Sequence, residues 1–346
     1  MSNSKGPKWR LYLTLAGFAG LAMLVYGLRH QILEAVRELG NINAVALLLI
    51  IPLKFLNYDA YARLYRGLFA VLGNKVEYWQ MYRLSLELNF VNYILPSAGI
   101  SGISYFGLRS RAYGISASKG TLAQFAKMLL LYVSYQPLLI IGLVLLAMRN
   151  HVNDLVLITA ASLITLLIAG TLFSIYMIES RRRIRTFLTF MTKILNVLIK
   201  LVQPRKKEAI NIAGAQAAFD ELHDNYRLYK KNWRDLKWPF IHTTFANLTE
   251  IASLYVVYLA FDQFVNLGAV ILAYAVANFA GLISVLPAGI GIYEGLMTGV
   301  LVATGIPAGL SLSVTIMFRL VTMAIQLPPG YLLYQRAVDN GLRSKS

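Results

Sequence analysis

Long apolar runs constrain this chain more than any other feature of its sequence. They occupy residues 11–28, 44–56, 122–148, 155–178 and 267–286. A helix that crosses a bilayer needs about 20 mainly apolar residues. Hydrophobic residues make up 57% of the chain and charged residues only 14%, which leaves too few charges for water-facing helical surfaces. We therefore predict an all-α, polytopic integral membrane protein with one transmembrane domain over residues 1–346.

The positive charges indicate how the chain sits in the membrane. The formal net charge is +17, and Lys and Arg gather near both chain ends and within residues 181–237. The predicted outer loops hold only Arg29, Arg37 and Arg149. Because Lys and Arg beside a span stay in the cytoplasm, we expect the cytoplasmic (inner) membrane, with both termini cytoplasmic. The cations mark the ends of spans, so nucleic acid is not the expected partner.

Residues 181–237 differ in character from the rest of the chain. They hold 14 Lys and Arg residues against five acids, and they predict two helices, at about 184–203 and 207–232. We interpret this segment as a basic, cytoplasmic, amphipathic helical insert. Two roles are open for it. It could bind lipid headgroups or a partner, or it could be a solvated connector held at the membrane surface by charge.

Two segments of the chain share a pattern of Pro and Gly. In both segments Asn-Phe is followed by Leu-Pro, then by small residues, and then by Gly-Ile-x-Ala. Pro96 and Gly114 are 18 residues apart, and so are Pro287 and Gly305. A long helix follows each, with a cation 31 or 32 residues after the Pro, at Lys127 and Arg319. We define a first repeat at 76–148 and a second at 267–336. Their predicted turn residues are Pro96, Gly99, Pro287, Gly289, Gly291 and Gly305.

Charge and parity predict that the two repeats are inverted copies. The first begins on the cytoplasmic side, whereas the second begins outside, near Asp262. Both Pro/Gly segments are predicted to be re-entrant, because Pro and Gly permit a sharp reversal of the chain. Paired interrupted helices of this kind are typical of transporters that bind substrate near the bilayer midplane. The alternative is that Pro and Gly only kink two packed helices.

Ionisable residues within spans are costly, so they are candidates for function. The strongest candidates are Glu294 and Arg319. We expect Glu294 to pair with Arg319 or Lys127, or to bind an amine headgroup. Arg319, Arg109 and Lys127 are expected to hold a lipid phosphate. A structural ion pair is the alternative, and Lys54 and Glu87 are candidates for an equivalent pair in the first half. The predicted substrate-binding residues are Glu294, Arg319, Arg109, Lys127, Glu87, Lys54, Asn92 and Glu250.

The tyrosines near these candidates are interpreted differently. Tyr58, Tyr61, Tyr93 and Tyr105 are expected to be interface and packing residues rather than a cage for a headgroup.

The second repeat carries a recognisable motif. Leu286-Pro287-Ala-Gly289-Ile-Gly291-Ile-Tyr-Glu294, followed by Gly305, Arg319 and Pro328-Pro329-Gly330, resembles the signature of the lysylphosphatidylglycerol synthase transmembrane region. Asn92, Pro96, Gly99 and Arg109 resemble the first signature of that family, except that Ile103 stands where Glu294 would align. The resemblance covers about 10–178 and 237–336. It implies a flippase-like membrane protein without the separate aminoacyltransferase domain of its bifunctional relatives.

These observations favour a lipid flippase or transporter that moves a phospholipid or a lipid-linked headgroup between leaflets. Its expected partners are membrane lipids, above all anionic ones, with a soluble or membrane transferase as a further candidate. No catalytic motif is found, so an enzyme is not expected. Cysteine is absent and the four His are dispersed, so no metal and no cofactor are expected. A subunit of a lipid-modifying or glycolipid-synthesising transferase and a non-catalytic membrane scaffold remain alternatives.

Overall fold

The computed structural model describes residues 42–94, 100–148, 154–183, 212–278 and 289–343, together with isolated positions between 26 and 40 and after 184. Every regular element within these ranges is a helix, as predicted. The α-helices are α3 (Ile50–Val71), α4 (Tyr78–Ile94), α5 (Ile100–Ser110), α6 (Ala117–Ala147), α7 (Asp154–Glu179), α9 (Ile212–Lys231), α10 (Lys237–Ala260), α11 (Leu267–Asn278), α13 (Ile292–Ala303) and α14 (Ala308–Arg343). Short 3-10 helices lie at Ala46–Leu49, Arg111–Tyr113 and Trp233–Leu236.

Three helices of the described chain are long and apolar enough to cross a membrane. They are α6, α7 and α14. α7 exposes large apolar side chains such as Ile158, Leu166 and Leu172, which suits a helix surrounded by lipid. α3 and α10 contain 22 and 24 residues, enough to cross a core of about 30 Å, but both carry buried polar side chains. The prediction of an all-α, polytopic membrane protein is confirmed.

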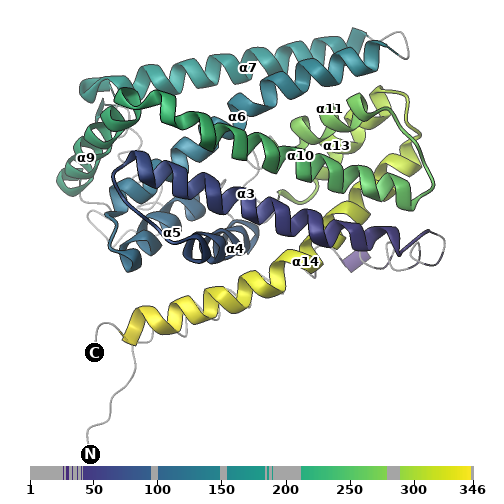
Figure 1. Ribbon diagram of the computed structural model, residues 1–346. Coiled ribbons are helices and arrows are strands. Elements are labelled where there is room, and N and C mark those ends of the chain that lie inside the picture. Colours follow the sequence, from purple (N-terminus) through teal and green to yellow (C-terminus); the bar gives the residue numbers. More distant parts are fainter. Residues whose placement is uncertain are drawn as a thin grey trace, which may run out of the picture.

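α3 and α10 form the central pair of the fold, and they run antiparallel. The N–H of Asn43, just before α3, donates to the carbonyl of Ala260 at the end of α10 (2.9 Å). At the opposite end, a Cβ added to Gly67 would lie 2.9 Å from Cγ of Pro239. Between these contacts Asn57 donates to the carbonyl of Ala246 (2.9 Å). The two helices therefore stay in contact along their whole length (Figure 1).

The helices that follow α3 in the chain come in the same order as the helices that follow α10. α3, α4, α5 and α6 correspond to α10, α11, α13 and α14. The short helices α5 and α13 are each followed by a glycine with positive φ, Gly114 (72°) and Gly305 (92°), and the long helix begins three residues later in both cases. The packing is reciprocal as well, because α4 contacts α14 and α11 contacts α6.

The two pairs of short helices lie at opposite ends of the bundle. α4 and α5 lie on the same side as α9, whereas α11 and α13 lie at the other end (Figure 1). α13 has 12 residues, about 18 Å of helix, so it does not cross a core of about 30 Å alone. The turn residues Pro96, Gly99 and Pro287 lie outside the described residues. That the pairs turn back inside a bilayer stays a prediction.

The basic insert is held against the bundle by its second helix. α9 falls within the predicted 207–232, while most of 184–203 lies outside the described residues. Ion pairs join Arg181 to Asp224 and Glu179 to Lys230, and the hydrogen bond that Lys230 donates to Glu179 raises the pKa of Lys230. The Tyr229 hydroxyl donates to the carbonyl of Leu68 on α3 (3.3 Å). These contacts favour the connector interpretation of this segment.

Cysteine labelling tests whether the short pairs are re-entrant, because the chain has no cysteine of its own. We expect Lys75→Cys and Ala112→Cys, which flank α4 and α5, to react with an impermeant maleimide from one side of the membrane. Gln263→Cys and Ala308→Cys, which flank α11 and α13, should react from the other side. All four positions are exposed. Labelling of the two flanks of one pair from opposite sides would contradict re-entrance.

A glycine allows the close approach of α11 and α6. A Cβ on Gly268 would lie 2.2 Å from the carbonyl oxygen of Gly142, whereas a Cβ on Gly170 in α7 meets nothing within 4 Å. We expect Gly268→Ala to destabilise the protein by about 1–3 kcal/mol through overpacking. Gly170→Ala, the matched control, should unfold in detergent at the wild-type temperature. Equal melting temperatures for both variants would show that α11 and α6 separate without cost.

Candidate functional site

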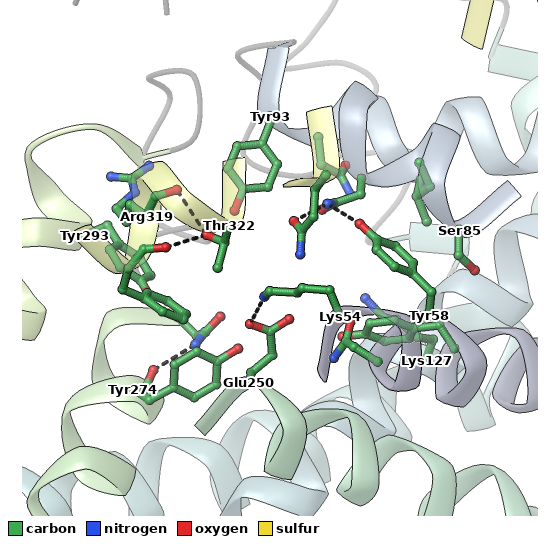
Figure 2. A pocket seen from close by; sticks show the side chains of 18 of the residues that line it. Lys54, Tyr58, Ser85, Tyr93, Lys127, Glu250, Tyr274, Tyr293, Arg319 and Thr322 are labelled. Atoms are coloured by element: carbon green, nitrogen blue, oxygen red, sulfur yellow. Dashed lines mark hydrogen bonds and ion pairs between the residues drawn. The ribbon is translucent and has the colours of Figure 1, made fainter. Parts of the chain in front are cut away.

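A polar cavity lies between the two halves of the fold. Its volume is about 310 Å³. Side chains of α3, α4 and α6 line it from the first half of the chain (Figure 2). Side chains of α10, α11, α13 and α14 line it from the second half. The lining consists of Lys54, Asn57, Tyr58, Tyr61, Tyr65, Ser85, Leu88, Asn89, Asn92, Tyr93, Lys127, Glu250, Tyr274, Asn278, Tyr293, Phe318, Arg319, Thr322 and Gln326.

An ion pair between Lys54 and Glu250 lies at the centre of this lining. The Lys54 Nζ atom is 2.6 Å from Glu250 Oε2, and the two side chains are only 3% and 14% exposed. The pair joins α3 to α10, and the ring of Phe318 lies 5.5 Å from the ammonium. Figure 2 shows the pair between Tyr274 and Tyr293 on one side and Tyr58 on the other. Each charge is thereby compensated inside the bundle, where an isolated charge is costly.

A second buried pair joins Arg319 of α14 to Glu294 of α13. The other carboxylate oxygen of Glu294 accepts the backbone N–H of Gly291 at the start of α13 (2.7 Å). A carboxylate in the first turn of a helix suits the dipole there. The guanidinium of Arg319 also lies 4.8 Å from the centroid of the Tyr293 ring, and its side chain reaches the cavity. Glu294 itself pairs with Arg319 but does not line the cavity.

Lys127 is the third cation of the lining. It comes from α6, and its Nζ lies 4.8 Å from the centroid of the Tyr61 ring. It lies on the side of the cavity opposite Arg319 (Figure 2). Tyr65 and Gln124, one turn away, are joined by a hydrogen bond of 2.5 Å. The described residues place no carboxylate in an ion pair with Lys127, unlike Lys54 and Arg319.

An amide network connects the two repeats across the cavity. The Asn89 amide on α4 donates to the hydroxyl of Tyr58 on α3 (2.7 Å) and to the side-chain oxygen of Gln326 on α14 (2.6 Å). Asn57 of α3 donates to Thr249 of α10 (2.9 Å). Polar groups that are buried in this way need partners, since an unpaired one costs about 1–3 kcal/mol. The network therefore orients the lining without filling the cavity.

Most of the predicted substrate-binding residues meet at this cavity. Lys54, Asn92, Lys127, Glu250 and Arg319 line it. Glu294 pairs with Arg319, which is one of the two partners expected for it.

One expectation about the first half is wrong. Lys54 does not pair with Glu87, because it pairs with Glu250 instead. Glu87 accepts hydrogen bonds from Arg109 Nε (2.9 Å) and from the hydroxyl of Tyr105 (2.8 Å), and this cluster lies apart from the cavity lining. Arg109 therefore fastens α5 to α4, and its contact with a lipid phosphate stays a prediction.

Three of the four tyrosines that were expected to pack at interfaces line the cavity. They are Tyr58, Tyr61 and Tyr93, whereas Tyr105 packs against Glu87 and Tyr334. A signal was present in α3, because Lys54, Asn57, Tyr58, Tyr61 and Tyr65 follow the helical spacing of a single polar face. The described residues contain no group of three or more His, Asp or Glu that could hold a metal ion.

Comparison with known proteins identifies the family. Residues 11–330 match the family described as the lysylphosphatidylglycerol synthase TM region. The chain belongs to this family. A UPF0104 membrane protein from Methanothermobacter thermautotrophicus is 34% identical over 91 residues, which are 26% of this chain and 27% of that protein. The matched stretch thus spans about a quarter of the relative. The family resemblance seen in the sequence is confirmed, and both comparisons agree with a membrane protein.

A double-mutant cycle tests the role of the family motif residues Glu294 and Arg319. We expect Glu294→Gln to destabilise the protein by about 3–5 kcal/mol, because it leaves a buried guanidinium without its carboxylate. Combining it with Arg319→Gln should recover most of that loss, since no buried charge then stays unpaired. Thermal unfolding in detergent measures both effects. Additive losses in the double variant would show that the two side chains do not act as a pair.

Proposed function

We propose that the chain binds the polar headgroup of a membrane lipid in the cavity and moves the lipid between the two leaflets. The observation that carries this proposal is the charged, tyrosine-rich cavity between two halves whose first helices, α3 and α10, run antiparallel. A headgroup that crosses the hydrocarbon core must leave water, which is costly for polar and charged groups. A cavity with ammonium, hydroxyl and amide groups offers such a headgroup new partners.

The size of the cavity suits a headgroup rather than a whole lipid. Ligand pockets commonly measure about 300–1,000 Å³, and this one measures about 310 Å³. The acyl chains of a bound lipid would remain in the bilayer. The outer surfaces of α6 and α7 expose large apolar residues, such as Ile140 and Leu166, that suit contact with such chains.

The arrangement of the halves supports a transport cycle. Transporters built from inverted repeats expose a central site to one side and then to the other by rocking one unit against its counterpart. In this chain the contacts that such a motion would have to change are Lys54–Glu250 and Asn89–Gln326, because both join the two halves at the cavity.

Charge supports a cytoplasmic location for the end of the bundle that carries α9. Residues 181–237 hold 14 of the 33 Lys and Arg residues. α14 also ends on that side (Figure 1), so the proposed orientation places the C-terminus in the cytoplasm. The family and the matched relative support a place in a membrane, and the inner membrane is part of this proposal.

Reconstitution tests the proposed activity. Purified protein in liposomes should speed the exchange of acyl-labelled fluorescent phospholipids between leaflets, measured by reduction of the outer-leaflet label with dithionite. We expect Lys54→Met combined with Glu250→Gln to lower the rate at least tenfold, because it removes both central charges without leaving either unpaired.

The matched control is Arg63→Gln. Arg63 pairs with Asp59 on the same helix but outside the cavity, and its side chain is 55% exposed. It should keep the wild-type rate. A wild-type protein that moves none of the labelled lipids would refute the proposal, as would an unchanged rate in the Lys54 and Glu250 double variant.

A further inference from the structure

Lys127 has a different environment from the other two cations of the cavity. Lys54 pairs with Glu250 and Arg319 with Glu294. Among the described residues, Lys127 has the face of Tyr61 as its neighbour and no carboxylate in an ion pair. A cation–π contact contributes about 0.5–2 kcal/mol. Removing a charge from water costs several kcal/mol even after relaxation, so Tyr61 alone does not compensate the ammonium.

The internal repeat explains this difference. Lys127 and Arg319 occupy matching places, 31 and 32 residues after Pro96 and Pro287. Glu294 follows its Pro by seven residues, and the residue at the same place in the first repeat is Ile103. The second repeat thus neutralises its cation with its own carboxylate, whereas the first repeat has an aliphatic side chain at that position.

The charges of the site therefore do not cancel. Within the described part of the chain, three cations, Lys54, Lys127 and Arg319, stand against two carboxylates, Glu250 and Glu294, which leaves one positive charge. Both carboxylates are already engaged, and each oxygen of Glu294 has a partner. An incoming anion would find an ammonium to pair with. An incoming primary ammonium would have to displace Lys54 or Arg319 from its carboxylate.

We propose that Lys127 receives the phosphate of the lipid headgroup, so that the cavity prefers phospholipids of net negative charge over those whose headgroup carries a primary ammonium. This inference rests on the proposed function, because it assumes that a headgroup enters the cavity. A phosphate offers several acceptor oxygens. Asn92 and Tyr93 also line the cavity and carry groups that can donate hydrogen bonds to it.

The preference sets this chain apart from the lipid in its family's description. Lysylphosphatidylglycerol carries ammonium groups on its lysyl headgroup, and they require carboxylates. The two carboxylates described at this site already hold Lys54 and Arg319. The geometry instead favours an anionic lipid such as phosphatidylglycerol itself.

A binding experiment tests the phosphate site without requiring transport. The full-length protein in detergent is unfolded thermally with dihexanoyl phosphatidylglycerol, with dihexanoyl phosphatidylethanolamine or with inorganic phosphate. A ligand that binds only the folded state raises the unfolding temperature. We expect a rise with phosphatidylglycerol and less than a third of that rise with either other ligand at equal concentration. An equal rise with inorganic phosphate or with phosphatidylethanolamine would overturn the proposal.

Variants assign the effect to Lys127. Lys127→Gln should abolish the rise with phosphatidylglycerol, and Lys127→Arg should keep it, because the positive charge is retained. Ile103→Glu should also abolish it, since it introduces at the matching position the carboxylate that the second repeat has. Lys75→Gln, an exposed cation outside the cavity, is the control and should respond as the wild type does. An unchanged response in both Lys127→Gln and Ile103→Glu would refute the assignment.

The relative transport rates of two lipids test this inference independently of the proposed function. Wild-type protein in liposomes should move phosphatidylglycerol at least tenfold faster than phosphatidylethanolamine, and Lys127→Gln should bring the ratio close to one. Equal rates in the wild type would overturn the inference and leave the proposed function intact. If no lipid moves but Lys127 is still required for phosphatidylglycerol binding, the proposed function fails and the phosphate site stands.

Discussion

The antiparallel contact between α3 and α10 is the interaction on which the rest of the structure depends. It places the first helix of one half against the first helix of the other, from Asn43 and Ala260 at one end to Gly67 and Pro239 at the other. The reciprocal contacts of α4 with α14 and of α11 with α6 surround this pair. Polar side chains on the facing sides of α3 and α10 find partners in each other, which is a requirement inside a membrane, where water is not available to them. The cavity opens next to this contact because both halves contribute polar faces there.

Buried charges in this protein serve two different purposes. Glu87 with Arg109 and Glu294 with Arg319 fasten a short helix to its neighbour, while Lys54 with Glu250 joins the two halves beside the cavity. A compensated pair of this kind contributes little net stability, but breaking it is expensive. The first two pairs therefore hold short helices that have few residues to bury. A pair between the halves is instead a contact that a transport cycle could break and form again, at a cost that an incoming headgroup could offset.

The repeat is close in helix order but not in charge. Gly114 and Gly305, which follow the short helices, both have a positive φ, and the long helices begin at the same offset from them. The charged side chains of the two repeats have diverged, because Ile103 stands where the other repeat has Glu294, and neither residue lines the cavity itself. A duplicated scaffold keeps its backbone through its glycines and its packing, whereas single side chains can change without disturbing it. One unbalanced cation in a symmetric frame is the kind of difference by which such a fold can select its ligand.

The sequence by itself determined the class of the fold, the approximate places of α6 and α7, and five residues of the cavity. These follow from local signals, namely apolar length and the cost of a charge in a span. Only the tertiary structure decided the partners. Lys54 meets Glu250 rather than Glu87, because α3 and α10 lie side by side although the two residues are 196 positions apart in the chain. Arg109 pairs with Glu87, 22 positions before it, away from the cavity lining. Tyr58 and Tyr61 share a polar face of α3 that the sequence shows, but only the packing places that face on a cavity, and Tyr93 has no such signal. Whether a tyrosine on a helix faces lipid, a neighbouring helix or a cavity depends on which other helices pack against it, and hydropathy along the chain carries no information about that packing.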